Sequence, residues 1–178
     1  FRTNSAVSLL SGFADHLIDN EQGGQLITDP ERQATQHSGA IDAKDFAKIK
    51  QQLTSLTDND EMLRHFIGGF YTQAKHELDL QPDLDLIADD DIKVAIAEHN
   101  LMRLGGVRAF YFPETLTEGI CYIDGKTVEF PKAISPIVQL MCDQVVITQD
   151  QLAPWTNNSD FIGFITAQLG AGYWYCAS

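Results

Sequence analysis

The chain of 178 residues is 44% hydrophobic and 21% charged, the composition of an ordinary globular protein with one domain or two small ones. Its formal net charge of −13 argues against binding to the phosphate backbone of nucleic acids and favours association with a basic protein. No apolar run approaches the ~18 residues that a membrane-spanning helix needs.

The first predicted element is an amphipathic helix over residues 5–20. Its apolar residues recur at spacings of three and four, and Asn4 or Ser5 is placed to cap the first turn. Residues 25–39 contain a proline and show no periodicity, which predicts a long exposed connection. The chain opens without an initiator Met or a secretory leader, and its first three residues read as the tail of a strand that leads into this helix.

Two more helices are predicted in the first half of the chain. The second follows Asp42 and places four apolar residues on one face: Phe46, Ile49, Leu53 and Leu56. The third begins near Asp58 or Asn59, and its apolar stripe is wider than one partner helix needs: Met62, Leu63, Phe66, Ile67, Phe70, Tyr71 and Ala74. This excess predicts either a central place in a helical bundle or a face buried against another subunit.

A domain boundary is predicted within residues 81–91, where Pro82 and alternating acidic residues interrupt the helical pattern. Three successive acids, Asp89 to Asp91, then precede a new apolar pattern, and acids at the start of a helix are favoured by its dipole. A calcium-binding loop is the competing interpretation. It is disfavoured because the spacing lacks the required glycine and terminal glutamate.

Beyond residue 100 the apolar period changes from that of a helix to that of strands. Gly105-Gly106 separates two short β-prone runs, and Asp124-Gly125 separates two more in the pattern typical of a β-hairpin. Helical segments follow, and a Tyr-Trp-Tyr-Cys run predicts a closing strand. Small helices with a hairpin wing predict a winged-helix-like domain, although its candidate recognition segments carry almost no Lys or Arg for contacting DNA.

Residues that might carry chemistry do not form a known motif. No histidine has an acid two residues later, as an oxygenase iron site requires, and the five histidines are His16, His37, His65, His76 and His99. There is no nucleophile elbow and no phosphate-binding loop, and Gly170-Ala171-Gly172 precedes a strand instead of opening a helix. The residues by themselves therefore show no catalytic apparatus.

The cysteines and the terminal aromatic residues have plain structural interpretations. Cys121, Cys142 and Cys176 are odd in number and widely spaced, which argues against a disulfide framework or a zinc site and fits a reducing cytoplasm. The aromatic run at 173–175 has no basic residue near it in sequence, as a base-stacking surface would need. We therefore expect it to form the core and rim of the closing strand.

Four stretches of the sequence, in this order and at these distances, resemble one known family. They are FRTNSAVSLLSGFADHLIDNE at the start, QAKHELDL in the middle, RLGGVRAFYF with YIDGKTVEF after it, and LGAGYWYC at the end. The chain resembles the carboxyl-terminal half of the bacterial JmjC-type ribosomal oxygenases, also called the cupin-4 family. The resemblance implies an iron(II)- and 2-oxoglutarate-dependent dioxygenase that hydroxylates an arginine of a large-subunit ribosomal protein in the cytoplasm.

The resemblance also implies an α+β, mostly helical layout. Residues 1–4 would end the last strand of a catalytic double-stranded β-helix (cupin/JmjC) domain that lies upstream. Residues 5–81 would form a helical dimerisation region, and residues 82–178 a winged-helix-like domain. Because the iron triad and the 2-oxoglutarate site belong to the upstream domain in this family, no catalytic, cofactor-binding or metal-binding residue is assigned here, and the chain alone is predicted to be inactive.

The expected partners follow from the same resemblance. We predict a homodimer whose helical bundle includes Phe46, Ile49, Leu53, Phe66, Ile67, Phe70 and Tyr71. A basic ribosomal protein is the expected substrate, and neither a membrane nor direct nucleic-acid binding is expected. Two alternatives stay open: a free-standing winged-helix interaction or DNA-binding module with a dimerisation arm, and a parent oxygenase that hydroxylates histidine or another target. A steep salt dependence of duplex binding would identify the DNA-binding module.

Overall fold

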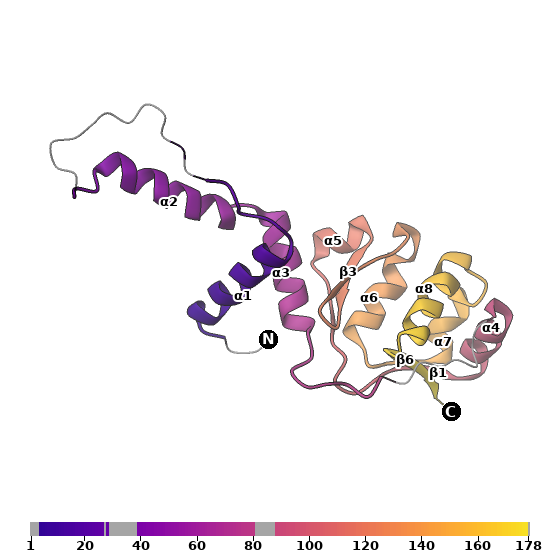
Figure 1. The fold of residues 1–178 in the computed structure, drawn as a ribbon. Coiled ribbons are helices and arrows are strands. Elements are labelled where there is room, and N and C mark those ends of the chain that lie inside the picture. The colour runs from indigo at the N-terminus through magenta and orange to yellow at the C-terminus, as the bar shows by residue number, and fades with distance from the viewer. Residues whose placement is uncertain (1–3, 27, 29–38, 81–87, 178) are drawn as a thin grey trace. The chain divides into compact units, whose positions relative to one another are not determined.

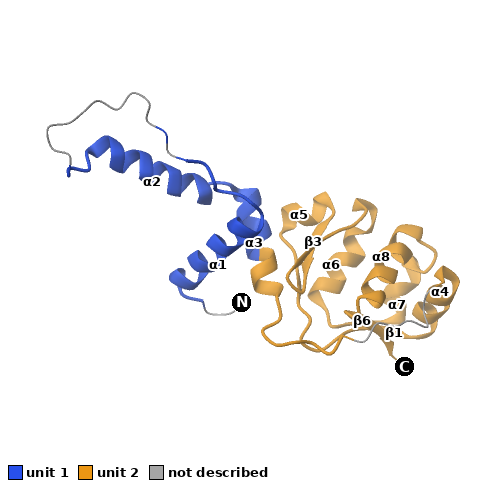
Figure 2. Ribbon diagram, viewed as in Figure 1, with its two compact units in different colours: residues 1–67 blue, residues 68–178 orange. Residues whose placement is uncertain are grey.

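The structure, a computed structural model, describes residues 4–26, 28, 39–80 and 88–177. It divides into two compact units, unit 1 (Phe1–Ile67) and unit 2 (Gly68–Ser178), coloured separately in Figure 2. Three of the sequence predictions fall wholly or largely outside the described residues: the strand tail at the start, most of the connection over 25–39, and the domain boundary at 81/82.

Unit 1 consists of helices α1 (Ala6–Asp19) and α2 (Ala43–Thr57) and the greater part of α3 (Asp60–Thr72). The Ser5 side chain accepts a hydrogen bond from the backbone N–H of Ser8 at 3.1 Å, and Asp42 accepts two at the start of α2. These bonds satisfy backbone donors that have no partner within the helix. The first two predicted helices and their caps are thereby confirmed.

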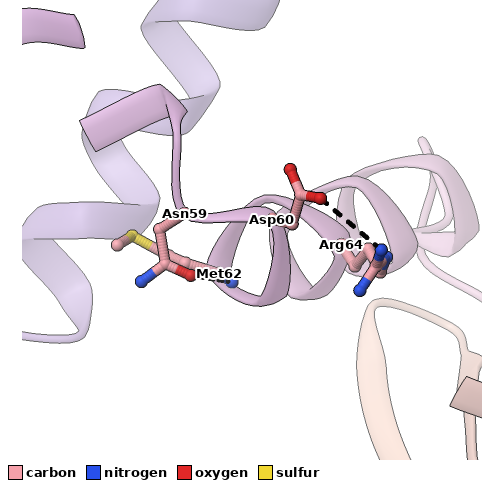
Figure 3. A network of polar contacts seen from close by, with 4 residues as sticks. All are labelled: Asn59, Asp60, Met62 and Arg64. Carbon is pink, nitrogen blue, oxygen red and sulfur yellow. Dashed lines mark hydrogen bonds and ion pairs between the residues drawn. The ribbon is translucent and has the colours of Figure 1, made fainter. Parts of the chain in front are cut away.

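The start of α3 is held by a small set of polar contacts, shown in Figure 3. Asn59 Oδ1 accepts a hydrogen bond from the backbone N–H of Met62 at 3.1 Å. Asp60 forms an ion pair with Arg64 one turn later, with 3.7 Å between the charged atoms. Asn59 therefore caps α3, whose start was predicted near Asp58 or Asn59, and the acids in the first turn, Asp60 and Glu61, complement the helix dipole.

The hydrophobic core of unit 1 is small. Among its described residues, only Phe13, Leu17 and Phe66 are buried hydrophobic side chains. The Phe13 and Phe66 rings lie 5.2 Å apart between centroids, which joins α1 to α3, but α2 contains no buried residue. A 15-residue helix that buries none of its side chains is marginally stable in water, so we expect α2 to gain stability from contacts beyond those of its own unit.

Unit 2 is built from short helices and two small sheets (Figure 1). Its helices are α4 (Asp89–Glu98), α5 (Pro113–Glu118), η1 (Lys132–Ile134), α6 (Ser135–Asp143), α7 (Gln149–Leu152), η2 (Ala153–Trp155) and α8 (Ser159–Gly170). Its strands are β1 (Asn100–Arg103), β2 (Ala109–Phe110), β3 (Ile120–Ile123), β4 (Lys126–Glu129), β5 (Val146–Ile147) and β6 (Trp174–Ala177). The chain as a whole has the α+β, mostly helical fold that was predicted.

The strands pair antiparallel in the orders β5-β1-β6 and β2-β3-β4. Asp124 and Gly125 form the turn between β3 and β4 with φ angles of 47° and 82°, the left-handed conformation that a tight hairpin turn needs at both positions, so the predicted hairpin is confirmed. The runs on either side of Gly105-Gly106 are also strands, but β1 and β2 enter different sheets.

The closing strand completes the core of unit 2. Tyr173 and Trp174 are buried and Tyr175 is 38% exposed, which confirms the prediction of core and rim. Helix α4 packs on α7 and α8, and its Ile92 and Ile96 are fully buried. Unit 2 thus has a continuous core of the size expected for a small domain, in contrast to unit 1.

The last turn of α3 belongs to unit 2 and is fitted closely to the β3–β4 hairpin. A Cβ atom at Gly68 would come within 2.3 Å of the buried Tyr122 ring, so only glycine permits this approach. Thr72 is fully buried, and its hydroxyl accepts a hydrogen bond from the backbone N–H of Gly125 at 2.9 Å. Asp124 accepts another from the backbone N–H of Ala74. These contacts fix the end of α3 on the hairpin turn.

Candidate interaction surface

Helices α1 and α2 carry six of the exposed large apolar side chains among the described residues. On α2 the side chains of Phe46, Ile49 and Leu53 are 65%, 46% and 64% exposed. Their spacing of three and four residues places them on one side of the helix, which we call the α2 face. A row of large exposed apolar side chains is unusual for a monomeric protein, which makes the α2 face a candidate interaction surface.

Helix α1 has two apolar sides. One carries Phe13 and Leu17 and is buried in unit 1. The other, which we call the outer α1 face, carries Val7, Leu10 and Ile18 at 78%, 64% and 73% exposure. The periodicity of the sequence identified α1 as amphipathic but did not separate these two sides, because both fall within one broad apolar arc.

The four predicted interface residues on α3 are placed differently from those on α2. Phe66 is buried inside unit 1 against Phe13, and Ile67 is half-buried. Phe70 and Tyr71, in the part of α3 that belongs to unit 2, are half-buried with their rings 5.5 Å apart in an edge-on arrangement. Part of the wide stripe of α3 is thus used within the chain.

Among the described residues, no group of three or more His, Cys, Asp or Glu side chains is arranged to hold a metal ion. Cys121 and Cys142 are buried, and a hydrogen bond with the Cys142 thiol, together with burial, raises the pKa of Cys121. A thiol held protonated is a poor nucleophile, so Cys121 is a core residue.

His16 lies beside the small core of unit 1, and its pKa is clearly shifted. Its ring lies 5.7 Å from that of Phe66, and its Nδ1 is 3.4 Å from the side-chain amide of Asn20. Burial, followed by the charge of nearby His65, lowers the pKa of His16, and Asp19 opposes this. The folded state therefore favours the neutral ring. This contribution to stability is complete above the unfolded-state pKa of ~6.5 and is lost as the pH falls below it.

We expect α1 to open more readily at about pH 5.5 than at about pH 7.5, because the unfolded state then gains a proton that the folded state resists. Hydrogen exchange of the α1 backbone amides, corrected for the intrinsic pH dependence, measures this. His16→Gln should flatten the pH dependence, and His76→Gln, at an exposed position outside unit 1, should leave it unchanged. An equal response of the wild type and His16→Gln would contradict the assignment.

Comparison with known proteins supplies the family. Residues 51–175 match the family described as the ROXA-like winged helix. This chain belongs to that family. The match covers β1 to β5, the first two residues of β6, the end of α2 and the helices after it, so the hairpin and the start of the closing strand are parts of a ROXA-like winged helix.

The chain is also similar to a longer protein of established activity. It is 25% identical over 176 residues to the ribosomal protein uL16 3-hydroxylase of Escherichia coli (strain K12), covering 98% of this chain and 45% of the relative. The chain therefore spans about half the length of the curated relative that it matches.

Within the described residues, no helix has both the length and the apolar character to span a membrane.

Solved structures show the same architecture. The Escherichia coli ribosomal oxygenase YcfD superposes with a TM-score of 0.84 at 25% identity, over 99% of this chain and 47% of that one. A second structure of YcfD, in complex with cobalt and 2-oxoglutarate, superposes with a TM-score of 0.83 at 24% identity, over 100% of this chain and 48% of that one. The arrangement of helices and strands is thus that of part of a ribosomal oxygenase.

Proposed function

We propose that this chain is part of an iron(II)- and 2-oxoglutarate-dependent oxygenase that hydroxylates an arginine of a large-subunit ribosomal protein in the cytoplasm. The observation that carries the proposal is the similarity to a uL16 3-hydroxylase over 98% of the chain. The superposition on YcfD over 99% of the chain supports it, and a YcfD complex with cobalt and 2-oxoglutarate supports the choice of cofactors. The net charge of −13 suits a cationic ribosomal substrate.

In this proposal the chain supports catalysis and does not perform it. Its described residues do not fit a metal centre, so iron and 2-oxoglutarate, which supply the oxidising chemistry, would be held by other parts of the intact protein. Residues 1–4 would end the catalytic domain, residues 5–81 would form a dimerisation region, and residues 82–178 would form the winged-helix domain. The chain would orient and assemble the enzyme.

The dimer proposed here uses the helical unit. The α2 face and the outer α1 face together expose six large apolar side chains: Val7, Leu10, Ile18, Phe46, Ile49 and Leu53. Domains with small cores commonly gain stability by oligomerisation, and unit 1 buries only three hydrophobic side chains among its described residues. A second copy of the same unit, packed as a helical bundle, would cover these faces.

The activity is tested with the intact protein, purified uL16, iron(II) and 2-oxoglutarate. Mass spectrometry of the digested substrate should show one added oxygen atom on an arginine-containing peptide, and omission of 2-oxoglutarate should abolish it. The 178-residue chain alone should give no product under the same conditions. Product formed by the chain alone, or none formed by the intact protein, would refute the proposal.

A further inference from the structure

The outer side of the β5-β1-β6 sheet carries an apolar row. Met102 is paired with Val146 of β5 on one side and with Tyr175 of β6 on the other. Directly paired residues point to the same side of a sheet, so the three side chains form one row across the strands. Val146 is 37% exposed, Tyr175 is 38% exposed, and Met102 is half-buried between them. We call this the sheet row.

The sheet row is distinct from the core of unit 2. The neighbouring residues on the opposite side of the same strands, Leu101 and Ile147, are fully buried. The alternation of side chains therefore buries one side of the sheet in the core and presents the other to solvent. On that outer side the three paired positions, Met102, Val146 and Tyr175, are all apolar. The solvent-exposed side of a sheet normally carries polar residues.

Acidic residues stand at both ends of this sheet. Glu98 ends α4 two residues before β1, and Asp143 ends α6 three residues before β5. Since β1 and β5 are antiparallel, their starts lie at opposite ends of the sheet. Both acids are exposed. Unit 2 holds fifteen acidic and six basic residues, so −9 of the net charge of −13 belongs to it.

Three of the basic residues of unit 2 have identified contacts, and Arg103, at the Asp143 end of the sheet, lies on the side opposite the sheet row. The Arg103 guanidinium donates to the carbonyl oxygens of Met141 and Cys142, each at 3.2 Å, and lies over the Trp174 ring. Lys93 forms an ion pair with Asp90 at 2.8 Å. Lys126 lies over the ring of Tyr173. None of these contacts is an ion pair with Glu98 or Asp143, and unit 2 keeps its net charge of −9.

We propose that the sheet row docks an extended, Lys- and Arg-rich segment of a protein. Apolar side chains of that segment would cover Met102, Val146 and Tyr175, and its cations would meet Glu98 and Asp143 at the two ends of the sheet. This inference rests on the proposed function, because the segment is assigned to the cationic ribosomal substrate, outside the residue that is hydroxylated. Charge complementarity favours this occupant over nucleic acid, which the field of unit 2 repels.

The experiment uses the intact protein and two substrates: full-length uL16 and a short synthetic peptide around the hydroxylated residue. Two variants test the surface by different routes. Tyr175→Asp places a charge in the sheet row, and the double variant Glu98→Lys/Asp143→Lys reverses the charge at its ends. The matched control is Glu118→Lys/Glu129→Lys, which makes the same charge change at exposed positions on α5 and β4.

For full-length uL16 we expect both test variants to lower kcat/KM and to weaken binding in biolayer interferometry at least tenfold, and the control much less. Turnover of the short peptide should be unchanged in all of them. Equal behaviour of test and control variants would overturn docking at this surface, as would equal losses on the short peptide. Docking is also overturned if the wild type does not bind full-length uL16. A different result would refute the proposed activity itself: neither full-length uL16 nor the short peptide would gain an oxygen atom.

Discussion

Replacing Leu53 by aspartate should convert a dimer into a monomer. Leu53 is 64% exposed at the C-terminal end of the α2 face, which we propose is buried between two subunits. An aspartate carboxylate buried there would lose its hydration without gaining an ion-pair partner. This would weaken the free energy of dimerisation by ~3 kcal/mol, which corresponds to roughly a 100-fold increase in the dissociation constant. Light scattering after size-exclusion chromatography at tens of micromolar should give twice 19.8 kDa for the wild type and 19.8 kDa for the variant.

The matched control is Gln51→Asp. Gln51 lies on the same helix and is exposed, but the helical period places it on the side opposite Leu53. The two variants add the same charge and the same loss of helix propensity, so they differ mainly in the face that they alter. A wild type that is monomeric, or a Gln51→Asp variant that dissociates as readily as Leu53→Asp, would exclude the α2 face as the interface.

Features of the fold that depend on neighbouring residues could be predicted from the sequence. A capping side chain acts within one turn, so Ser5 and Asp42 could be recognised beside the helices that they begin. The Asp124-Gly125 turn was recognisable for the same reason, because both residues tolerate the left-handed conformation. Helix α5 was not predicted, since its six residues are too few to show a period.

Features that depend on distant residues could not be predicted. The pairing of β1 with β6 joins Leu101 to Cys176, and nothing local to either strand specifies it. The same holds for the candidate interface. Phe46 and Phe66 both appeared as members of apolar stripes, but only tertiary structure shows that Phe66 packs on Phe13 while Phe46 stays 65% exposed. A period identifies an apolar side of a helix and does not say which partner covers it.

The two units use their apolar residues in different ways, and the charge follows the same division. Unit 2 closes its own core and holds most of the negative charge, whereas unit 1 leaves large apolar side chains exposed. In one assembly, unit 1 would associate with a copy of itself and unit 2 with a cationic protein. That assembly would cover the exposed apolar side chains of unit 1 and neutralise part of the negative charge of unit 2. The Leu53 and Tyr175 variants separate these roles, because the first is expected to change the oligomeric state and the second to change only docking.

Gly68→Ala is expected to destabilise unit 2 strongly. Its Cβ would lie 2.3 Å from the Tyr122 ring, which is fully buried and contacts Phe112 edge-on with 5.9 Å between ring centroids. Either the ring or the last turn of α3 must move, and overpacking of this kind costs ~1–3 kcal/mol or more. The better helix propensity of alanine recovers at most ~1 kcal/mol. Thermal unfolding followed by near-UV circular dichroism should therefore show a Tm lower by roughly 5–10 °C.

Gly163→Ala is the matched control for this effect. Gly163 lies in α8, and a Cβ there would meet no atom within 4 Å, so only the gain in helix propensity remains. That variant should be as stable as the wild type or more stable, by up to ~1 kcal/mol. Because both variants make the same chemical change in a helix of unit 2, the difference between their Tm values measures the fit of α3 against Tyr122. If Gly68→Ala matched Gly163→Ala in Tm, the close contact between α3 and the hairpin would not exist in solution.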